Sequence, residues 1–279
     1  MDKIFVVGCP RSGTTLLQSL LASHSEIVSF PETHLFSKTI SINSVARFFT
    51  VYRNTHFTKV KNIVDDLGGE ATHDWLNYPV FNTHTWVNLL LNNLDRVGEA
   101  NSTDGERYLL EKTPRHLHFV DLIQAVDPSI KVIHIIRRGE DVVASMVEAT
   151  SDNPDEWKGS RSVEKSIFWW NRSIRHSKKY IGATNNLHIR YENLVTDTEA
   201  VLRYLCQKLG LSFENQMVAQ HHETAKDMIS KGEHWKAKNT SSGITFSDKF
   251  NNFPQEVQKV IKNELTDFNY SAIDIDRLN

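Results

Sequence analysis

The chain opens on an apolar run, a glycine-containing turn and then a leucine-rich stretch. Residues 4–7 have the continuous apolar character of a buried parallel strand. The leucines after the turn recur at helical spacing: Leu16, Leu17, Leu20 and Leu21. The pattern predicts a strand, a tight loop and a helix. In such a unit the loop amides and the positive end of the helix form an anion site.

Four later apolar runs predict further strands. They cover residues 26–30, 107–112, 131–136 and 187–194, the last including the exit of its strand. Helical patterns alternate with them; one runs over 162–180 with Ile167, Trp170 and Ile174 facing inward, and another over 196–211 ends at Gly210. Strands that alternate with helices are typical of an α/β fold, so we expect a P-loop-type parallel sheet flanked by helices.

Residues 37–105 carry a weaker pattern. Two apolar groups at helical spacing are separated by polar segments; they are Val45, Phe48, Phe49 and Tyr52, and Trp86, Leu89, Leu90 and Leu94. We interpret this region as a helical insertion that caps a binding pocket, within one domain spanning 1–279. A stripe at helical spacing is more often core than pocket lining, so we assign these apolar residues to the core.

Composition narrows the class of protein. The 279 residues carry a formal net charge of -2, which gives no basic field for nucleic acid, and no apolar run is long enough to span a membrane. The first strand begins at Ile4 and leaves no room for a signal peptide, so we expect a soluble cytoplasmic protein. Two isolated thiols, Cys9 and Cys206, provide neither a disulfide framework nor a metal site. We assign Cys9 to packing of the loop.

The first loop departs from the usual nucleotide-binding motif. Gly8 and Gly13 have the spacing of G-x-x-x-x-G-K-[ST], but Thr14 stands at the lysine position and Thr15 at the hydroxyl position. Arg11 supplies a positive charge inside the loop instead. A loop of this kind suits an anion other than a magnesium-bound triphosphate.

Residues 10–17 resemble the 5′-phosphosulfate-binding loop of sulfotransferases that use 3′-phosphoadenosine 5′-phosphosulfate (PAPS). The resemblance implies that the loop binds this donor through Arg11, Ser12, Gly13, Thr14 and Thr15. The segment after strand 131–136 resembles the 3′-phosphate site of the same family, with Arg137 at the strand end and Ser145 eight residues on. Arg138 and Gly139 depart from the family's Arg-Asp-Pro turn.

Other segments resemble the family as well. The turn at Glu32 resembles the acidic turn that supplies the general base in protein-tyrosine sulfotransferases, with His34 or His116 as alternative bases. The resemblance also implies a donor contact for Lys112 at the end of strand 107–112. It further assigns the nucleotide to Tyr191 and to a late basic loop containing Lys231 and Gly232.

These features predict a metal-independent, PAPS-dependent sulfotransferase. Its acceptor would be the hydroxyl or amine of a small molecule or a peptide, with Glu32 taking the proton while Arg11 and Lys112 stabilise charge. A nucleotide-dependent kinase or hydrolase stays open, because Glu111 ends an apolar strand as a metal-binding acid does. A non-catalytic nucleotide-binding regulator is the third possibility. Neither the acceptor nor the oligomeric state follows from the sequence.

Overall fold

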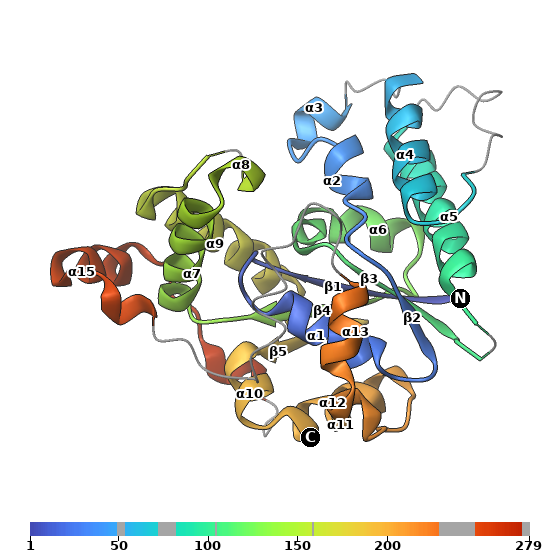
Figure 1. Ribbon diagram of the computed structural model, residues 1–279. Helices are drawn as coiled ribbons and strands as arrows, with labels where there is room; N and C mark the ends of the chain where they lie inside the picture. The colour runs from blue at the N-terminus through green and yellow to red at the C-terminus, as the bar shows by residue number, and fades with distance from the viewer. Residues whose placement is uncertain (49–53, 72–81, 104, 158, 229–248, 275–279) are drawn as a thin grey trace.

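A computed structural model describes residues 1–48, 54–71, 82–103, 105–157, 159–228 and 249–274. This part of the chain forms a five-stranded sheet with helices packed around it (Figure 1). The strands are β1 Asp2–Gly8, β2 Ile27–Ser29, β3 Tyr108–Lys112, β4 Lys131–Ile136 and β5 Asn186–Arg190. Their order is β2-β3-β1-β4-β5, and every pairing is parallel. The predicted α/β fold is confirmed.

Helices form the connections between the strands. The α-helices are α1 Thr14–Ala22, α2 Leu35–Thr39, α3 Ser44–Phe48, α4 Asn54–Asp66, α5 Thr83–Asn101, α6 Val120–Val126, α7 Gly139–Asp152, α8 Pro154–Trp157, α9 Val163–Ser177, α10 Tyr191–Thr196, α11 Thr198–Leu209, α12 Gln216–Ala219, α13 His221–Asp227 and α15 Gln255–Glu264. The 3₁₀ helices are η2 Pro114–Phe119, η3 Lys178–Tyr180, η5 Lys249–Asn252 and η6 Tyr270–Ile273. Within the described ranges, no helix combines the length and the apolar character needed to cross a membrane.

The sheet separates two parts of the hydrophobic core. Successive side chains of a strand point to opposite faces, so Phe5 and Val7 pack with helices α4, α5 and α6. Ile4 and Val6 pack on the other face with α1 and α11. Because both faces are covered, β1 is apolar without interruption from Ile4 to Val7 and carries no polar alternation.

The register of the sheet brings two strand ends to the first loop. Val6 of β1 lies across from Lys112, the last residue of β3. Gly8, the last residue of β1, lies across from Ile135 of β4. The carboxyl ends of β3 and β4 therefore flank the loop that follows β1, which is the edge where ligands bind in open α/β sheets.

The weakly patterned region 37–105 is helical where it is described. Trp86, Leu90 and Leu94 of α5 are buried as expected. Val45 is 65% exposed, so its assignment to the core is wrong. Helix α3 has only five residues, too few to set an apolar face by periodicity. Phe49 and Tyr52 lie outside the described residues.

Other element boundaries differ slightly from the prediction. Strand β2 has three residues, Ile27–Ser29, rather than five. The pattern over 162–180 divides into α9 and the 3₁₀ helix η3, with the three predicted inward residues buried. Gly210 adopts the left-handed conformation at the end of α11, as its predicted cap requires.

Candidate functional site

The loop between β1 and α1 is a tight turn that leads directly into the helix. The Ser12 amide donates to the carbonyl oxygen of Cys9 at 3.1 Å. Arg11 and Gly13 both have positive φ, 75° and 90°. Gly13 is also the N-cap of α1 and makes no side-chain capping bond. Since a helix N-terminus leaves several amides without intrahelical acceptors, the loop and helix together form an anion site.

Both glycines of the loop are required by close packing. A Cβ atom on Gly8 would lie 2.6 Å from the carbonyl oxygen of Ile135. On Gly13 it would lie 2.3 Å from the ring of Tyr191. The guanidinium of Arg137 lies over the same ring, 4.4 Å from its centroid. The loop, Tyr191 and Arg137 are therefore packed as one unit.

Glu32 and Lys112 meet beside this loop, because the strands whose ends carry them, β2 and β3, are neighbours in the sheet. Lys112 Nζ donates to Glu32 Oε1 at 2.6 Å and to the Thr15 hydroxyl at 3.4 Å. The Glu32 side chain is 8% exposed and that of Lys112 is fully buried. His34 Nε2 lies 3.4 Å from the other Glu32 oxygen. An acid, a cation and a loop hydroxyl thus share one small space.

A buried carboxylate holds both partners of this pair in place. Glu111 Oε1 accepts from the hydroxyls of Thr33 and Thr113, at 2.9 and 2.6 Å. Thr33 follows Glu32, Thr113 follows Lys112, and the Thr113 hydroxyl accepts from the His34 amide at 3.2 Å. Glu111 Oε2 lies 2.9 Å from His116 Nδ1, and both side chains are fully buried.

This arrangement concerns two alternatives from the sequence: Glu111 as a metal-binding acid and His116 as the general base. Glu111 is fully buried, and both of its oxygens have protein partners: Thr33 and Thr113 on one, and His116 on the other. His116 is equally buried, and its Nδ1 is occupied by Glu111. Burial raises the pKa of Glu111, but His116 and the hydroxyl donors outweigh it and hold that pKa below its usual value. Glu111 is a positioning group in this geometry.

Arg137 and Ser145 converge on the loop from β4 and α7. Arg11 Nε donates to the Ser145 hydroxyl at 3.1 Å. Arg137 donates from one terminal nitrogen to the Arg11 carbonyl oxygen at 3.2 Å. Arg137 Nε and the Ser12 hydroxyl are buried, and neither has a hydrogen-bond partner among the described residues. Buried donors without partners are costly, so this cluster fits an anionic ligand.

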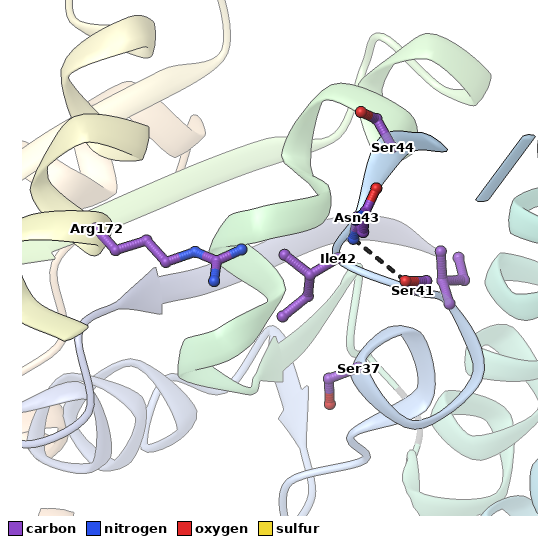
Figure 2. Close-up of a pocket in the computed structure, with 7 residues that line it drawn as sticks. Ser37, Ser41, Ile42, Asn43, Ser44 and Arg172 are labelled. Carbon is purple, nitrogen blue, oxygen red and sulfur yellow. Dashed lines mark hydrogen bonds between the residues drawn. The ribbon is translucent and has the colours of Figure 1, made fainter. Parts of the chain in front are cut away.

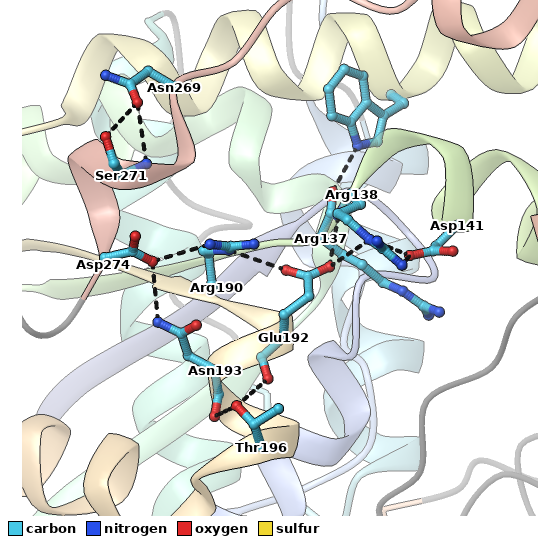
Figure 3. Close-up of polar contacts among 11 residues, drawn as sticks. Arg137, Arg138, Asp141, Arg190, Glu192, Asn193, Thr196, Asn269, Ser271 and Asp274 are labelled. Carbon is cyan, nitrogen blue, oxygen red and sulfur yellow. Dashed lines mark hydrogen bonds and ion pairs between the residues drawn. The ribbon is translucent and has the colours of Figure 1, made fainter.

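Hydrogen bonds from three elements fix the turn after Arg137. The Arg138 amide donates to Glu192 Oε1 at 3.0 Å, and its side chain bonds Asp141 at 2.9 Å (Figure 3). Trp170 donates its indole N–H to the Arg137 carbonyl oxygen at 3.1 Å. Sequence reasoning missed Glu192. Its position two residues after strand β5 was the available signal, since polar groups at strand ends meet at one edge.

Burial shifts the pKa values of two side chains in the loop, Arg11 and Cys9. Burial and the neighbouring Arg137 lower the pKa of Arg11 to about 10, so the guanidinium is still charged at neutral pH. Burial raises the pKa of Cys9 to about 12. A thiol with that pKa is protonated and poorly nucleophilic, which agrees with a packing role.

Most of the sequence-predicted site residues lie in this one region. The structure brings together Glu32, Lys112, Arg137, Ser145 and Tyr191 around the loop. Lys231 and Gly232 lie outside the described residues. Within the described part of the chain, no group of three or more His, Cys, Asp or Glu side chains is arranged to hold a metal ion.

Comparison with known proteins agrees with this fold. The model of a protein family described as "Sulfotransferase family" matches residues 3–215. The chain is 25% identical over 227 residues to protein-tyrosine sulfotransferase 1 of Danio rerio, covering 80% of this chain and 56% of that protein. It also matches an uncharacterised Aquifex aeolicus protein, at 24% identity, but spans only 27% of its length. The chain thus corresponds to part of these longer relatives.

Two solved structures show a similar fold. The sulfotransferase domain of the Synechococcus PCC 7002 olefin synthase has a TM-score of 0.57 and 21% identity, with 96% of each chain covered. Mouse sulfotransferase SULT7A1, crystallised with 3′-phosphoadenosine 5′-phosphate (PAP), has a TM-score of 0.55 and 14% identity, covering 94% of this chain and 82% of that one. Such low identities establish the fold and leave the ligands of this chain open.

Proposed function

This chain belongs to the sulfotransferase family, and we propose that it transfers a sulfuryl group from PAPS to a hydroxyl or amine acceptor. One observation carries the proposal. Lys112 Nζ lies 2.6 Å from Glu32 and 3.4 Å from the Thr15 hydroxyl of the anion loop. A proton acceptor and a charge-stabilising group therefore stand beside the place where the loop would hold an anion.

The donor would be held at both of its charged ends. The 5′ end would be bound by the loop amides and side chains of residues 11–15, since Arg11 is charged and the Ser12 hydroxyl lacks a described partner. The 3′-phosphate would be bound by Arg137 and Ser145. Arg137 Nε is a buried donor without a described partner, and a guanidinium can bind a phosphate through two parallel hydrogen bonds. Tyr191 would contact the adenine, and Lys231 and Gly232 stay predicted nucleotide ligands.

In the proposed reaction, the acceptor oxygen or nitrogen forms a bond to sulfur while the bond from sulfur to the bridging phosphate oxygen breaks. PAPS supplies the sulfuryl group and leaves as PAP. Glu32 takes the acceptor proton, a contribution of about 10²–10⁴-fold in rate. Lys112 and Arg11 stabilise negative charge on the sulfonate and on the departing phosphate. Glu111, through Thr33 and Thr113, holds the Glu32 and Lys112 backbones at their mutual distance.

Two further proposals concern the surroundings of this chemistry. We propose that residues 37–105 cap the acceptor site within a single domain, because α2 begins three residues after Glu32. A cytoplasmic location stays a prediction from the sequence. The acceptor is a small molecule or a peptide; one relative is named for sulfation of tyrosine in proteins.

The proposal is tested with PAPS labelled in its sulfuryl group. The label is expected to pass to members of a panel of phenol, sugar and tyrosine-peptide acceptors in the presence of a metal chelator, and Glu32→Gln should lower the rate by about 10²-fold or more. Glu199→Gln is the matched control, since it makes the same change at an exposed carboxylate on α11, where Glu199 pairs with Arg203. Transfer of the ATP γ-phosphate that stops on adding the chelator would favour a kinase. Tight PAP binding with no turnover of any acceptor would favour the regulator.

A further inference from the structure

An open pocket lies between the segment after Glu32 and helix α9. It has a volume of about 690 Å³ and is lined by Ser37, Ile40, Ser41, Ile42, Asn43, Ser44 and Arg172. Figure 2 shows the Arg172 side chain extending from its helix toward Ile42 on the opposite wall. The walls carry hydroxyl and amide groups and one cation. Arg172 is the only charged residue in this lining.

Two further arginines, Arg115 and Arg161, lie near Arg172 or near each other. The guanidinium groups of Arg115 and Arg172 lie 5.5 and 5.7 Å from the centroid of the Trp169 ring. Arg161 lies near enough to Arg115 for their charges to interact. Partial burial, and then the nearby Arg172, lower the pKa of Arg115, which is the direction expected where cations gather.

The three arginines lack acidic partners in the part of the chain that the structure describes. None of them forms an ion pair there, whereas Arg138, Arg190, Arg203 and Arg96 do. The one polar contact of the Arg161 guanidinium among those residues is to the Met146 sulfur at 3.1 Å. Cations that share a site and have no carboxylate beside them create a local field that attracts an anion.

One wall of the pocket begins five residues after Glu32 at Ser37, and the other wall, α9, contacts Cys9 of the loop through Ser173. Arg115 follows Lys112 by three positions, and the Ser37 hydroxyl donates to the carbonyl oxygen of His34 at 3.1 Å. Cys9 of the anion loop bonds the Ser173 side chain, the residue after Arg172. An acceptor with its reactive group at Glu32 could therefore extend a second group to the arginines without leaving the protein.

We propose that the acceptor carries an anionic group, that Arg172 binds it in this pocket, and that Arg115, whose guanidinium shares the Trp169 ring with Arg172, adds to the positive field there. The inference rests on the proposed sulfuryl transfer and names the chemical class of its acceptor. A carboxylate or a sulfonate would suit the site equally, because a guanidinium binds either through two parallel hydrogen bonds. Neutral acceptors of the same shape lack this interaction and bind more weakly.

The test compares three phenols that differ mainly in charge. They are 4-hydroxyphenylacetate, 4-hydroxybenzenesulfonate and the neutral 4-hydroxyphenylacetamide, each titrated by calorimetry into protein saturated with PAP so that the donor site is filled. The carboxylate or the sulfonate is expected to bind at least about tenfold more tightly than the amide. Which of the two binds better identifies the kind of anion.

Variants test whether the tighter binding of the anionic probes depends on the pocket. Arg172→Gln should reduce the advantage of the anionic probe to below about threefold, and Arg115→Gln should reduce it in part, while both variants leave PAP affinity unchanged. Arg175→Gln is the matched control, because Arg175 lies on the same helix, is exposed and does not line the pocket. It should keep the full advantage.

The outcomes separate the two proposals. Equal binding of the anionic and neutral probes, no detectable binding of the anions, or an advantage that survives in Arg172→Gln would overturn the inference while leaving PAP binding intact. Failure of PAP itself to bind would reject the proposed function. In that case the same titrations into the free protein would still test the pocket.

Discussion

Gly13→Ala is expected to disturb the donor site far more than an alanine at an open glycine would. The added Cβ would lie 2.3 and 2.6 Å from two carbons of the Tyr191 ring, where carbon atoms normally stay about 3.5–4.0 Å apart. The ring must therefore retreat by about 1 Å or more. Tyr191 is only 9% exposed and lies against Arg137, so its movement displaces the guanidinium that we assign to the 3′-phosphate.

Gly182 provides the matched control for this variant. Gly13 and Gly182 both have positive φ, 90° and 77°, so alanine costs about 1–2 kcal/mol in backbone conformation at either position. Nothing lies within 4 Å of a Cβ on Gly182, whereas Gly13→Ala adds an overpacking cost of about 1–3 kcal/mol. The difference between the two variants isolates the collision with Tyr191.

Two assays test the argument. In thermal unfolding, Gly13→Ala should lower the Tm by roughly twice the shift of Gly182→Ala. In calorimetric titration, Gly13→Ala should weaken PAP binding by at least about tenfold, and Gly182→Ala should leave it unchanged. In a double-mutant cycle, Tyr191→Ala should lower the Tm less in the Gly13→Ala background than in the wild type, because there it also removes the atoms that collide. Equal Tm shifts and equal PAP affinities in the two single variants would refute the packing of loop, tyrosine and arginine as one unit.

Three further predictions concern the chemistry and the core. Lys112→Met should lower kcat by about 10²–10³-fold in the labelled-PAPS assay, and an effect confined to KM would contradict a role in stabilising transition-state charge. Glu111→Gln should destabilise the fold by about 1–3 kcal/mol and also lower kcat, as measured by urea unfolding and initial rates; a wild-type kcat in a folded variant would show that it does not position Glu32. Burial lowers the pKa of His188 from 6.5 to about 4, so only the unfolded chain takes up this proton between those values. The free energy of unfolding should therefore decrease as the pH is lowered from 6.5 to about 4, by up to about 1.4 kcal/mol per pH unit for this histidine, and His188→Gln should flatten this slope in urea titrations at several pH values.

The elements that the sequence predicts well are those whose pattern is long or chemically constrained. Strand β1 is buried on both faces, so its apolar run is continuous and easy to recognise. The placement of Glu32 and Lys112 at strand ends also follows from local information, but their meeting depends on the strand order, which the structure supplies. Each residue comes at or just after the end of a strand, and those strands are neighbours in the sheet.

The helices of region 37–105 were harder to predict because two of them are very short. Helices α2 and α3 have five residues each, less than two turns, and such a segment shows no reliable period. Val45 was assigned to an inward stripe on spacing alone, yet it is exposed.

Contacts that depend on packing between distant segments could not be read from the sequence. Tyr191 lies against Gly13, although Gly13 follows β1 and Tyr191 follows β5, far apart in the sequence. The network of Glu111 with Thr33 and His116 depends on how η2 packs against β1. The grouping of the pocket arginines likewise requires α9 to lie beside η2.

The most direct test of the account is calorimetric titration of the chain with PAP in the absence of magnesium, for the wild type, Arg137→Ala and the surface control Arg96→Ala. We expect micromolar or tighter binding to the wild type and to Arg96→Ala, and a loss of at least about tenfold in Arg137→Ala, equivalent to about 1.4 kcal/mol. Absence of PAP binding to the wild type, together with magnesium-dependent binding of ATP or GTP, would contradict the assignment of this site to a PAPS-type donor.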